Sequence, residues 1–414
     1  MKLFKRNEPR TTPAGKVAGW RAAYENGGRL KLASAISAEC ARLVTLEFKS
    51  RIHGTQRAEL LNSAYADVVG RARSFCETAC ALGGVMLKPY VADGRLYTAY
   101  VPADSFVVTK IAPDGSICGV KFFERTELDG RLYKKCEEHI FDGGDYHITN
   151  TAYLCRGGSE GEVPLSEVPE WADFEPEVYF TNVKAPMFAY LRMPFADPSD
   201  LTSPLGAPVF ARAGALIEDA ERQYERLLWE FESGERALYI DETAMRRNMF
   251  GEMLLPEHRL YRMLNTGNDE LFMDWSPEIR DEALINGFER ILQRIEFNCG
   301  LAYGTLSDPQ SVEKTAEEIR ASRQRSYATI TEIQTALKAA LTGWAEAADI
   351  LCSIYGLAPE GEYSIDFEFD DSIVAPRTTE FSERMQLLNA GVITAEEMRA
   401  WYLGEEYIGR KTDE

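Results

Sequence analysis

The sequence predicts an α+β subunit whose long, charged helices cannot all be buried by one chain. Two helices, from about Ser203 to Glu235 and from about Glu278 to Cys299, bracket a short β-rich stretch that ends near Pro277. A break containing Gly, Ser, Asp and Pro follows at Gly300–Val312, and a third helix runs from Ala316 to Tyr355. Helices in this order need packing partners along their apolar stripes, so we expect neighbouring copies of the chain to supply them.

The composition is that of a folded protein that does not attract nucleic acid through its overall charge. The chain has 414 residues, enough for two or three ordinary domains or one elongated subunit. Its 45% hydrophobic and 11% aromatic residues can form a core. Its net charge is −20, whereas a free nucleic-acid-binding domain is usually basic. Any contact with DNA should therefore be local or transient.

The cysteines, the apolar runs and the first residues of the chain indicate the compartment in which the protein folds. The eight cysteines are scattered and no secretory signal precedes them, which indicates a reducing compartment and free buried thiols. No apolar run approaches the roughly 20 residues that a membrane helix needs. The first 21 residues carry six Lys and Arg residues against the single Glu8, and we interpret residues 1–20 as a flexible basic arm.

Residues 21–202 are predicted to form helices first and a β region afterwards. Apolar residues recur at helical spacing from Trp20 to Phe48 and from Thr55 to Ala81, where Gly83-Gly84 ends the second helix. From Val85 to about Tyr179, short runs of Val, Ile, Tyr and Phe alternate with Asp-Gly, Pro-Asp-Gly and Gly-Gly turns, which predicts a β-meander or small barrel. Two stretches are then expected to lack regular structure: a surface loop at 157–169 and an extended, proline-containing connection at 184–205.

The first long helix carries a narrow apolar stripe among many charged residues. At about 1.5 Å per residue this helix would be about 45 Å long. A narrow stripe on a charged helix is typical of packing between helices, here around a ring. The stripe consists of Phe210, Ala213, Ile217, Ala220, Tyr224, Leu227 and Phe231.

Between the two helices, alternating runs at 237–240, 260–264 and 270–275 predict short strands. Open strand edges pair with neighbouring subunits or partner proteins, although a hairpin private to the chain is the alternative. After the second helix, Pro309 prevents helix continuation. The pair Thr315 and Glu318 then fits a capping box that starts the third helix.

The last part of the chain is predicted to be a strand and two closing helices with an acidic surface. Residues Tyr363 to Phe369 alternate as a strand does, and Thr394 with Glu397 fits a second capping box. From Leu357 to Glu414 there are 14 acidic and 5 basic residues, a net charge of −9.

Motifs for catalysis or metal binding are weak. Gly157-Gly158-Ser159-Glu160-Gly161 has the nucleophile-elbow pattern, but Val163-Pro164 follows where that motif needs a helix. Cys136, His139, His147 and Cys155 do not have the spacing of a known zinc site, and Cys76 with Cys80 fits one core face of a helix. There is no Walker A sequence and no His-Glu-x-x-His.

One acidic pattern leaves an alternative open. Asp366, Glu368 and Asp370 alternate along the predicted strand and so share one face. Carboxylates on one face could hold Mg²⁺ for a nuclease, whereas the simpler interpretation is a solvent-facing strand.

Four short motifs stand in order along the chain and carry a resemblance to a known family. They are Lys88-Pro89-Tyr90-Val91, Ser203-Pro204-Leu205-Gly206, Trp275-Ser276-Pro277-Glu278-Ile279-Arg280 and Lys314-Thr315-Ala316-Glu317-Glu318-Ile319. Together with the order of the helices, they resemble the portal proteins of tailed bacteriophages, in the family typical of phages with Gram-positive hosts. The resemblance spans roughly Trp20 to Leu403.

The resemblance implies a phage portal fold. Such a subunit is elongated and has an α/β wing, a two-helix stem, a small β-rich clip, a tunnel loop, a long wing helix and a short helical crown. The implied segments are 1–20 (arm), 21–202 (wing), 203–235 (first stem helix), 236–277 (clip), 278–299 (second stem helix), 300–313 (tunnel loop), 314–376 (long wing helix and β return) and 377–414 (crown).

The resemblance also implies a function without catalysis, metal or cofactor. Portal subunits form a ring, usually of twelve, at one capsid vertex of the virion, and are assembled in the cytoplasm of the host bacterium. The implied partners are the terminase large subunit, a head-completion or adaptor protein, the major capsid and scaffolding proteins, and double-stranded DNA that passes through without sequence preference. No membrane is involved.

Two sets of residues are the expected sites. The DNA channel would be lined by the small, polar tunnel loop and the residues at its end: Tyr303, Thr305, Leu306, Ser307, Asp308, Gln310, Ser311, Lys314 and Arg320. Partners would bind the clip through Leu238, Tyr239, Phe250, Leu260, Tyr261, Phe272 and Trp275. The alternatives are a metal-dependent phage nuclease that uses Asp366, Glu368 and Asp370, and a helical adaptor or scaffold component.

Overall fold

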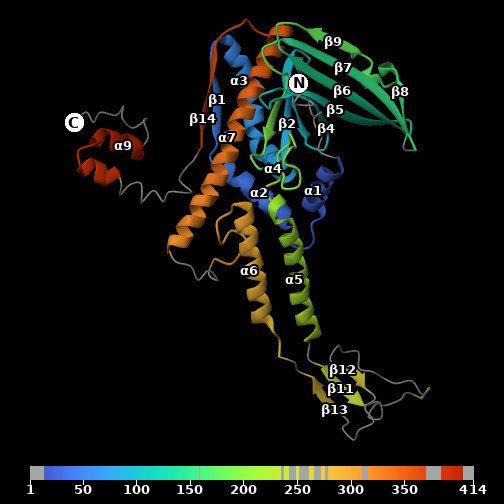
Figure 1. The fold of residues 1–414 in the computed structure, drawn as a ribbon, viewed down its shortest axis with the longest axis vertical. Helices are drawn as coiled ribbons and strands as arrows, with labels where there is room; N and C mark the ends of the chain where they lie inside the picture. The colour runs from blue at the N-terminus through green and yellow to red at the C-terminus, as the bar shows by residue number, and fades with distance from the viewer. Residues whose placement is uncertain are drawn as a thin grey trace, which may run out of the picture. The chain divides into compact units, whose positions relative to one another are not determined.

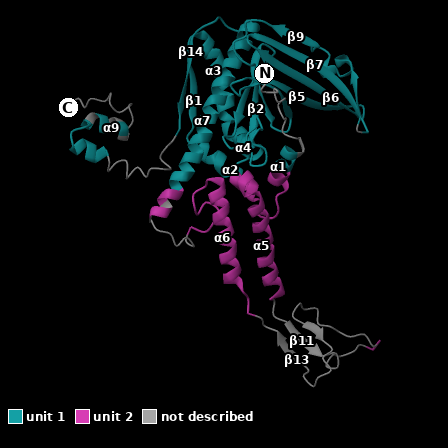
Figure 2. Cartoon of the chain, in the orientation of Figure 1, with its two compact units in different colours: residues 1–21, 37–209, 323–414 teal, residues 22–36, 210–322 magenta. Residues whose placement is uncertain are grey.

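The computed structural model of the chain describes residues 14–157, 159–234, 237–241, 249–250, 261–264, 272–275, 278–309, 316–369 and 384–403. The chain divides into two compact units (Figures 1 and 2). Unit 1 contains residues 1–21, 37–209 and 323–414, and unit 2 contains residues 22–36 and 210–322. Each unit is thus built from segments that are distant in the sequence.

The helical region at the start of the chain is broken where the sequence predicted one helix. The structure has α1 (Ala14–Asn26) and α2 (Leu32–Val44), separated by Gly27-Gly28. Gly28 has φ +56°, a conformation that glycine adopts at low cost. The carboxylate of Glu221 accepts the N–H groups of Arg29 and Leu30 at 3.0 and 2.9 Å, which stabilises the turn. The prediction of one helix was wrong because a glycine pair can turn the chain.

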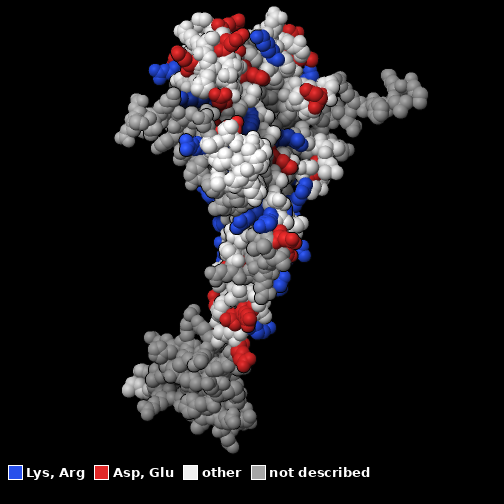
Figure 3. Space-filling model, turned by 90° about the vertical axis from the view of Figure 1, so that its left-hand side faces the viewer, with Lys and Arg blue, Asp and Glu red and all other residues white. Residues whose placement is uncertain are grey.

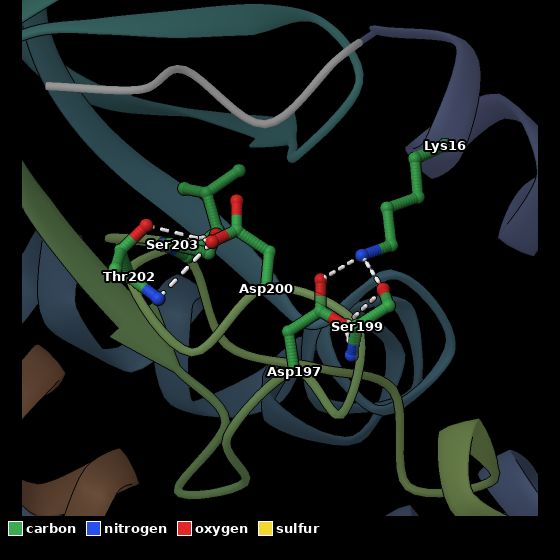
Figure 4. A network of polar contacts seen from close by, with 7 residues as sticks. Lys16, Asp197, Ser199, Asp200, Thr202 and Ser203 are labelled. Carbon is green, nitrogen blue, oxygen red and sulfur yellow. Dashed lines mark hydrogen bonds and ion pairs between the residues drawn. The ribbon is translucent and has the colours of Figure 1, made fainter.

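The prediction of a flexible arm over residues 1–20 also needs correction, because α1 begins at Ala14. Lys16 donates to the carboxylate of Asp197 and to the Ser199 hydroxyl, as Figure 4 shows. Burial raises the pKa of Asp197, but hydrogen bonds from Lys16 and Ser199 outweigh this effect and hold the pKa below its ordinary value. Arg21 binds Asp104 with an Nη2–Oδ1 distance of 2.9 Å. These ion pairs attach α1 to the rest of unit 1.

A second helical region is also divided, and a strand precedes it. The structure has β1 (Lys49–Gly54), α3 (Gln56–Gly70) and α4 (Ala72–Leu82), with a turn at Arg71. Gly83, with φ +85°, ends α4 as the sequence predicted. Strand β1 was missed because its partner, β14 (Tyr363–Glu368), lies at the other end of the chain.

The strands between α4 and α5 form two sheets, where the sequence predicted one β-meander or small barrel. The first sheet has the order β10-β2-β3, and the second has the order β4-β5-β6-β7-β8, with β9 also paired to β7. The strands are β2 (Gly84–Ala92), β3 (Arg95–Pro102), β4 (Phe106–Ile111), β5 (Ile117–Leu128), β6 (Arg131–Asp142), β7 (Asp145–Arg156), β8 (Ser159–Val163), β9 (Glu177–Phe180) and β10 (Ala189–Arg192).

The predicted turns are confirmed. Asp93-Gly94 and Asp129-Gly130 have positive φ at both positions, which is the backbone of the two-residue hairpin that an Asp-Gly pair favours. The predicted loop at 157–169 is wrong in part, because β8 pairs with β7. The short 3₁₀ segments η1 (Leu165–Glu167) and η2 (Pro169–Trp171) follow β8, and Trp171 packs in a cluster with Tyr133, Ala152 and Val168.

The long helix α7 (Ala316–Ile354) is confirmed, and its second half is central to the core of unit 1. Trp344 is wholly buried, and its indole N–H donates to Thr98 Oγ1 at 2.8 Å. The ring of Tyr65 on α3 lies 5.5 Å from the ring of Trp344. The buried apolar residues along this part of α7 recur at helical spacing: Ile330, Ile333, Leu337, Ala340, Leu341, Ala345, Ala348 and Cys352.

Unit 2 contains two helices that pack side by side in antiparallel directions, α5 (Gly214–Ser233) and α6 (Asp281–Cys299). Tyr224 and Phe288 bring their rings to 6.0 Å across this pair. The predicted pairing is therefore confirmed. The start of the first helix at Ser203 was wrong, because residues 203–210 are not helical and the short 3₁₀ segment η3 (Ala211–Ala213) leads into α5. Pro204 and Pro208 disfavour a helix in that stretch.

The predicted strands between α5 and α6 are confirmed. They are β11 (Ala237–Asp241), β12 (Tyr261–Leu264) and β13 (Phe272–Trp275). Strand β11 is central, parallel to β12 and antiparallel to β13. After β14, residues 384–389 are helical and α9 (Ala395–Leu403) follows. The capping box at α9 is present, since Thr394 Oγ1 accepts the N–H of Glu397 and Glu397 Oε2 accepts the N–H of Thr394 at 2.7 Å.

A buried polar network joins the sheet of β10, β2 and β3 to the sheet that contains β6 and β7. Glu137 Oε1 accepts hydrogen bonds from Lys88 on β2 and from His139 Nε2, the latter at 2.6 Å. His139 Nδ1 accepts from the Tyr146 hydroxyl at 2.8 Å, and that hydroxyl accepts from the N–H of Met187 at 3.2 Å. Every proton in this chain of bonds has an acceptor when His139 is neutral.

The protonation states follow from the surroundings. Burial lowers the pKa of His139, which favours the neutral imidazole in the folded protein. Burial alone would raise the pKa of Glu137, but the hydrogen bond from His139 and the charge of Lys88 hold that pKa far below its ordinary value. Protonation of the unfolded histidine below about pH 6.5 therefore favours unfolding. The contribution of His139 to stability is full above that pH and is lost as the pH falls.

We expect Tyr146→Phe to lower the free energy of unfolding by about 1–3 kcal/mol, because it leaves the N–H of Met187 and the His139 ring nitrogen without partners. Urea unfolding at pH 7.5 measures the change. Tyr179→Phe is the matched control, since Tyr179 is 65% exposed and should change stability by less than about 0.5 kcal/mol. Equal effects of the two substitutions would contradict a structural role for the network.

Candidate functional site

The segment after α6 is folded back onto that helix. Gly300, with φ +70°, ends α6, and the N–H of Leu301 donates to the carbonyl oxygen of Glu296 at 2.8 Å. The N–H of Tyr303 donates to Ser322 Oγ at 2.7 Å, and the N–H of Asp308 donates to Glu289 Oε2 at 2.9 Å. Residues 301–309, which we call the α6–α7 loop, are thus attached to the helices on both sides of them.

The buried carboxylate of Glu296 makes the central contacts of this loop. Its Oε1 accepts the N–H groups of Leu306 and Ser307 at 2.6 and 2.9 Å. The Ser307 hydroxyl lies 3.1 Å from Oε1 and 3.0 Å from Oε2. The N–H groups of three consecutive loop residues, 306–308, are therefore bound to carboxylates of the same chain.

The loop includes most of the residues predicted to line a DNA channel. Tyr303, Thr305 and Leu306 are partly exposed and Asp308 is exposed. Ser307 is 3% exposed, so its side chain is not on the loop surface as the sequence suggested. Arg320 is exposed on α7. Gln310, Ser311 and Lys314 lie outside the described residues, as does Thr315 of the predicted capping box.

The residues predicted to bind partners belong to the three-stranded sheet of unit 2. Leu238 and Tyr239 lie on the central strand β11, Tyr261 on β12, and Phe272 and Trp275 on β13. Phe250 is 81% exposed. Leu260 lies outside the described residues. Since β11 is paired on both sides, β12 and β13 are the edge strands of this sheet.

An ion pair joins the end of α5 to the start of α6. Glu230 Oε1 accepts from the backbone N–H and Nε of Arg280 at 3.1 and 3.0 Å, and Oε2 accepts from Nη2 at 2.7 Å. Hydrogen bonding to the Arg280 side chain lowers the pKa of Glu230 to about 2. This bidentate ion pair holds the C-terminal end of α5 next to the N-terminal end of α6.

Charges of opposite sign are interspersed on one face of the described residues. On the face that Figure 3 shows, acidic and basic side chains alternate without a large patch of one sign. None of the described helices is both long and apolar enough to cross a membrane.

The acidic strand face has a histidine beside it that the sequence did not indicate. Asp366 Oδ2 on β14 lies 3.3 Å from His53 Nε2 on β1, and both side chains are at least half exposed. They border a pocket of about 510 Å³, lined by Phe48, Lys49, Ser50, Arg51, His53, Val69, Asp366 and Glu368. Asp370 lies outside the described residues. His53 was missed because only the antiparallel pairing of β1 with β14 brings it near Asp366.

This pocket does not have the donor set of a metal centre. No group of three or more His, Cys, Asp or Glu residues in the described part of the chain is arranged to hold a metal ion. Lys49 pairs with Glu368 and Arg51 with Asp366 in the strand register, so cationic side chains stand beside the carboxylates. The exposed face of β14 matches the simpler interpretation of a solvent-facing strand.

The other candidate sites are also structural. His139 belongs to the buried network, and His147 stacks on Tyr179 with ring centroids 4.0 Å apart. Cys136, Cys76 and Cys80 are buried free thiols. Ser159 begins β8, so the strand that follows it is not the helix that a nucleophile elbow needs.

The comparisons with known proteins find similar solved structures but no related sequence. The sequence matches no protein-family model and no curated protein. Among solved structures, the chain is similar to a chain in the neck of a native GTA particle computed with C12 symmetry. The TM-score is 0.49, the sequences are 12% identical, and the match covers 95% of each chain.

We expect the purified chain to leave linear double-stranded DNA intact in the presence of Mg²⁺ or Mn²⁺, because Asp366 and Glu368 face cationic neighbours and lack a third ligand among the described residues. Gel electrophoresis after incubation tests this. Metal-dependent cleavage that Asp366→Asn abolishes would contradict the expectation and favour the nuclease alternative.

Proposed function

We propose that this chain is the portal subunit of a tailed phage or prophage. Copies of it would form a ring-shaped DNA channel at one capsid vertex, which supports head assembly, terminase docking, genome packaging and ejection, and head–tail connection. The observation that carries the proposal is the antiparallel pair α5 and α6, with a small sheet between them in sequence and a tightly bound loop followed by the 39-residue helix α7. The same order of elements, together with the four sequence motifs, is the basis of the resemblance to phage portal proteins.

Assembly into a ring is supported by apolar surface on the two helices. Trp229 on α5 is 66% exposed, and Phe231 on α5 and Ile285 on α6 are 43% and 41% exposed. Large apolar side chains on charged helices favour burial against another protein surface. In a ring, the stem helices of neighbouring copies would cover them. Twelve copies would carry 12 × −20 = −240 charges, so pairing of Arg and Glu between subunits must be extensive.

Passage of DNA without capture is supported by the α6–α7 loop. Backbone N–H groups bind phosphate readily, but those of residues 306–308 are already bound to Glu296 and Glu289. The loop surface carries the exposed Asp308 and the partly exposed Tyr303, Thr305 and Leu306. Weak phosphate contacts would come from Lys314 and Arg320 at the end of the loop.

Binding of the terminase and of a head-completion protein is assigned to the sheet of β11, β12 and β13. In the edge strands β12 and β13, the backbone N–H and C=O groups on the side away from β11 can form hydrogen bonds with a further strand. A partner protein can supply that strand. We place the clip there, in residues 236–277.

The test of the proposed function is the particle formed by the purified full chain. We expect size-exclusion chromatography with light scattering to give a large oligomer, and negative-stain projections to show a ring with a central hole. A monomer or small oligomer at micromolar concentration would contradict the proposal and favour an adaptor or scaffold component.

We expect the loop to limit the channel. Replacing Asp308, Pro309 and Gln310 by Gly-Ser-Gly should leave ring assembly intact and reduce the length or retention of packaged DNA, because the stiff, acidic end of the loop is lost. Ser307 is kept, since its side chain is bound to Glu296. Gel analysis of DNA from purified particles measures both quantities. Normal packaging and normal retention would show that the loop is not a constriction.

A further inference from the structure

Glu296 is an unusual residue in unit 2, because its side chain is completely buried. Glutamate is almost never buried without partners that satisfy its carboxylate. The partners here are the N–H groups of Leu306 and Ser307 and the hydroxyl of Ser307, at distances of 2.6 to 3.1 Å. All of them belong to the α6–α7 loop, so the loop and the carboxylate satisfy each other.

The position of Glu296 on α6 explains why it can hold the loop. It lies in the last turn of the helix, which ends at Cys299, and its own carbonyl oxygen accepts the N–H of Leu301. Gly300 reverses the chain with φ +70°, and residues 304–307 return toward the helix. The side chain of Glu296 therefore reaches loop residues about ten positions further along the chain.

The other attachments of the loop are weaker or lie elsewhere. The bond from Asp308 to Glu289 is exposed, so water competes with it. The bond from Tyr303 to Ser322 holds the first part of the loop to α7, outside the turn at 305–307. Two further bonds lie within the loop: the N–H of Gly304 donates to Ser307 Oγ at 3.3 Å, and Thr305 Oγ1 donates to the carbonyl oxygen of Ala302 at 2.6 Å. The bonds to Glu296 differ from these because they join the turn at 305–307 to α6, and those of Ser307 are buried.

We infer that Glu296 is the positioning residue that fixes residues 304–308 against the last turn of α6. The inference rests on the proposed function for its biological role, because there the loop lines the channel. Glu296 then decides where the exposed side chain of Asp308 stands, and it keeps the N–H groups of residues 306 and 307 turned inward, away from DNA phosphates.

Isosteric variants separate hydrogen bonding from packing. Glu296→Gln keeps one oxygen that can accept both N–H groups, and its amide can donate to the Ser307 hydroxyl. Glu296→Met has nearly the same length but no strong acceptor. The two variants thus fill the same space and differ in their ability to hold the loop. Glu282→Gln, at an exposed position in the first turn of α6, is the control for loss of a charge.

Hydrogen exchange of the purified full chain, followed by mass spectrometry, measures the loop directly. We expect Glu296→Met to speed exchange in residues 301–309 by about 10- to 100-fold, and Glu296→Gln to stay within about threefold of the unsubstituted chain. Exchange in α5 and in the core of unit 1 should not change. Unchanged loop exchange in Glu296→Met, or equal acceleration by Met and Gln, would overturn the inference.

Ser307→Ala keeps the test decisive if Glu296→Met does not fold. This variant removes the hydroxyl that bonds to both carboxylate oxygens of Glu296 and that accepts the N–H of Gly304. Exchange at residues 306 and 307 should therefore be faster than in Glu282→Gln. Loop exchange equal to that of Glu282→Gln would count against the inference.

The two proposals fail in different ways. Loss of loop protection in Glu296→Met, in a chain that forms no ring, would support the role of Glu296 and contradict the portal function. A ring whose loop protection is unchanged in Glu296→Met would support the portal function and contradict the role of Glu296. If both proposals hold, particles with Glu296→Met should assemble and retain less DNA, and those with Glu296→Gln should retain a normal amount.

Discussion

Unit 1 depends on the burial of one side of α7. Trp344 is the centre of this contact, since it is fully buried, touches Tyr65 on α3 and donates to Thr98 on β3. A Cβ on Gly343 would lie 3.2 Å from the Cβ of Ala189 on β10, so the helix approaches the first sheet closely where its side chains are smallest. The helix thereby holds together segments of the first half of the chain that do not follow one another in sequence.

Polar side chains of the same helix contact a buried arginine of α3. Arg57 on α3 is 1% exposed, and its Nη2 donates to Ser353 Oγ on α7 at 2.9 Å, with Asp349 3.3 Å from Nε. Lys338 lies 5.1 Å from the ring centre of Phe369, just after β14. A buried guanidinium is costly to leave unpaired, so these contacts favour one arrangement of α3 relative to α7.

Both units use a carboxylate where the chain must be fixed in one place. Glu137 binds Lys88 and His139 between two sheets, and Glu296 binds the turn of the α6–α7 loop. The surroundings differ, because Glu137 has a cation beside it and Glu296 is held by backbone N–H groups and a hydroxyl. Hydrogen bonds to a charged oxygen are stronger than those between neutral groups, which suits positions that must not move.

Local sequence patterns were sufficient for elements whose signals are short-range. The Asp-Gly hairpins, the strands between α5 and α6, the capping box at Thr394 and the long helix α7 all depend on neighbouring residues or on a repeating apolar pattern. The break at Gly27-Gly28 and the late start of α5 were missed, although the glycine and proline residues that cause them were visible.

Tertiary structure alone decided the contacts that join distant segments. Strand β1 exists because β14 pairs with it, and His53 meets Asp366 only through that pairing. Glu296 looked like one more charged residue on an amphipathic helix, and Ser307 like an exposed polar residue of a loop. The sequence around these residues does not predict the direction in which the chain turns after Gly300. That turn determines that the carboxylate of Glu296 and the N–H groups of Leu306 and Ser307 come together. The sequence by itself therefore determined the long helices and the hairpins with strong turn signals, because these follow from local propensity and periodicity. The pairing of distant strands and the burial of a charge depend on the whole fold around them.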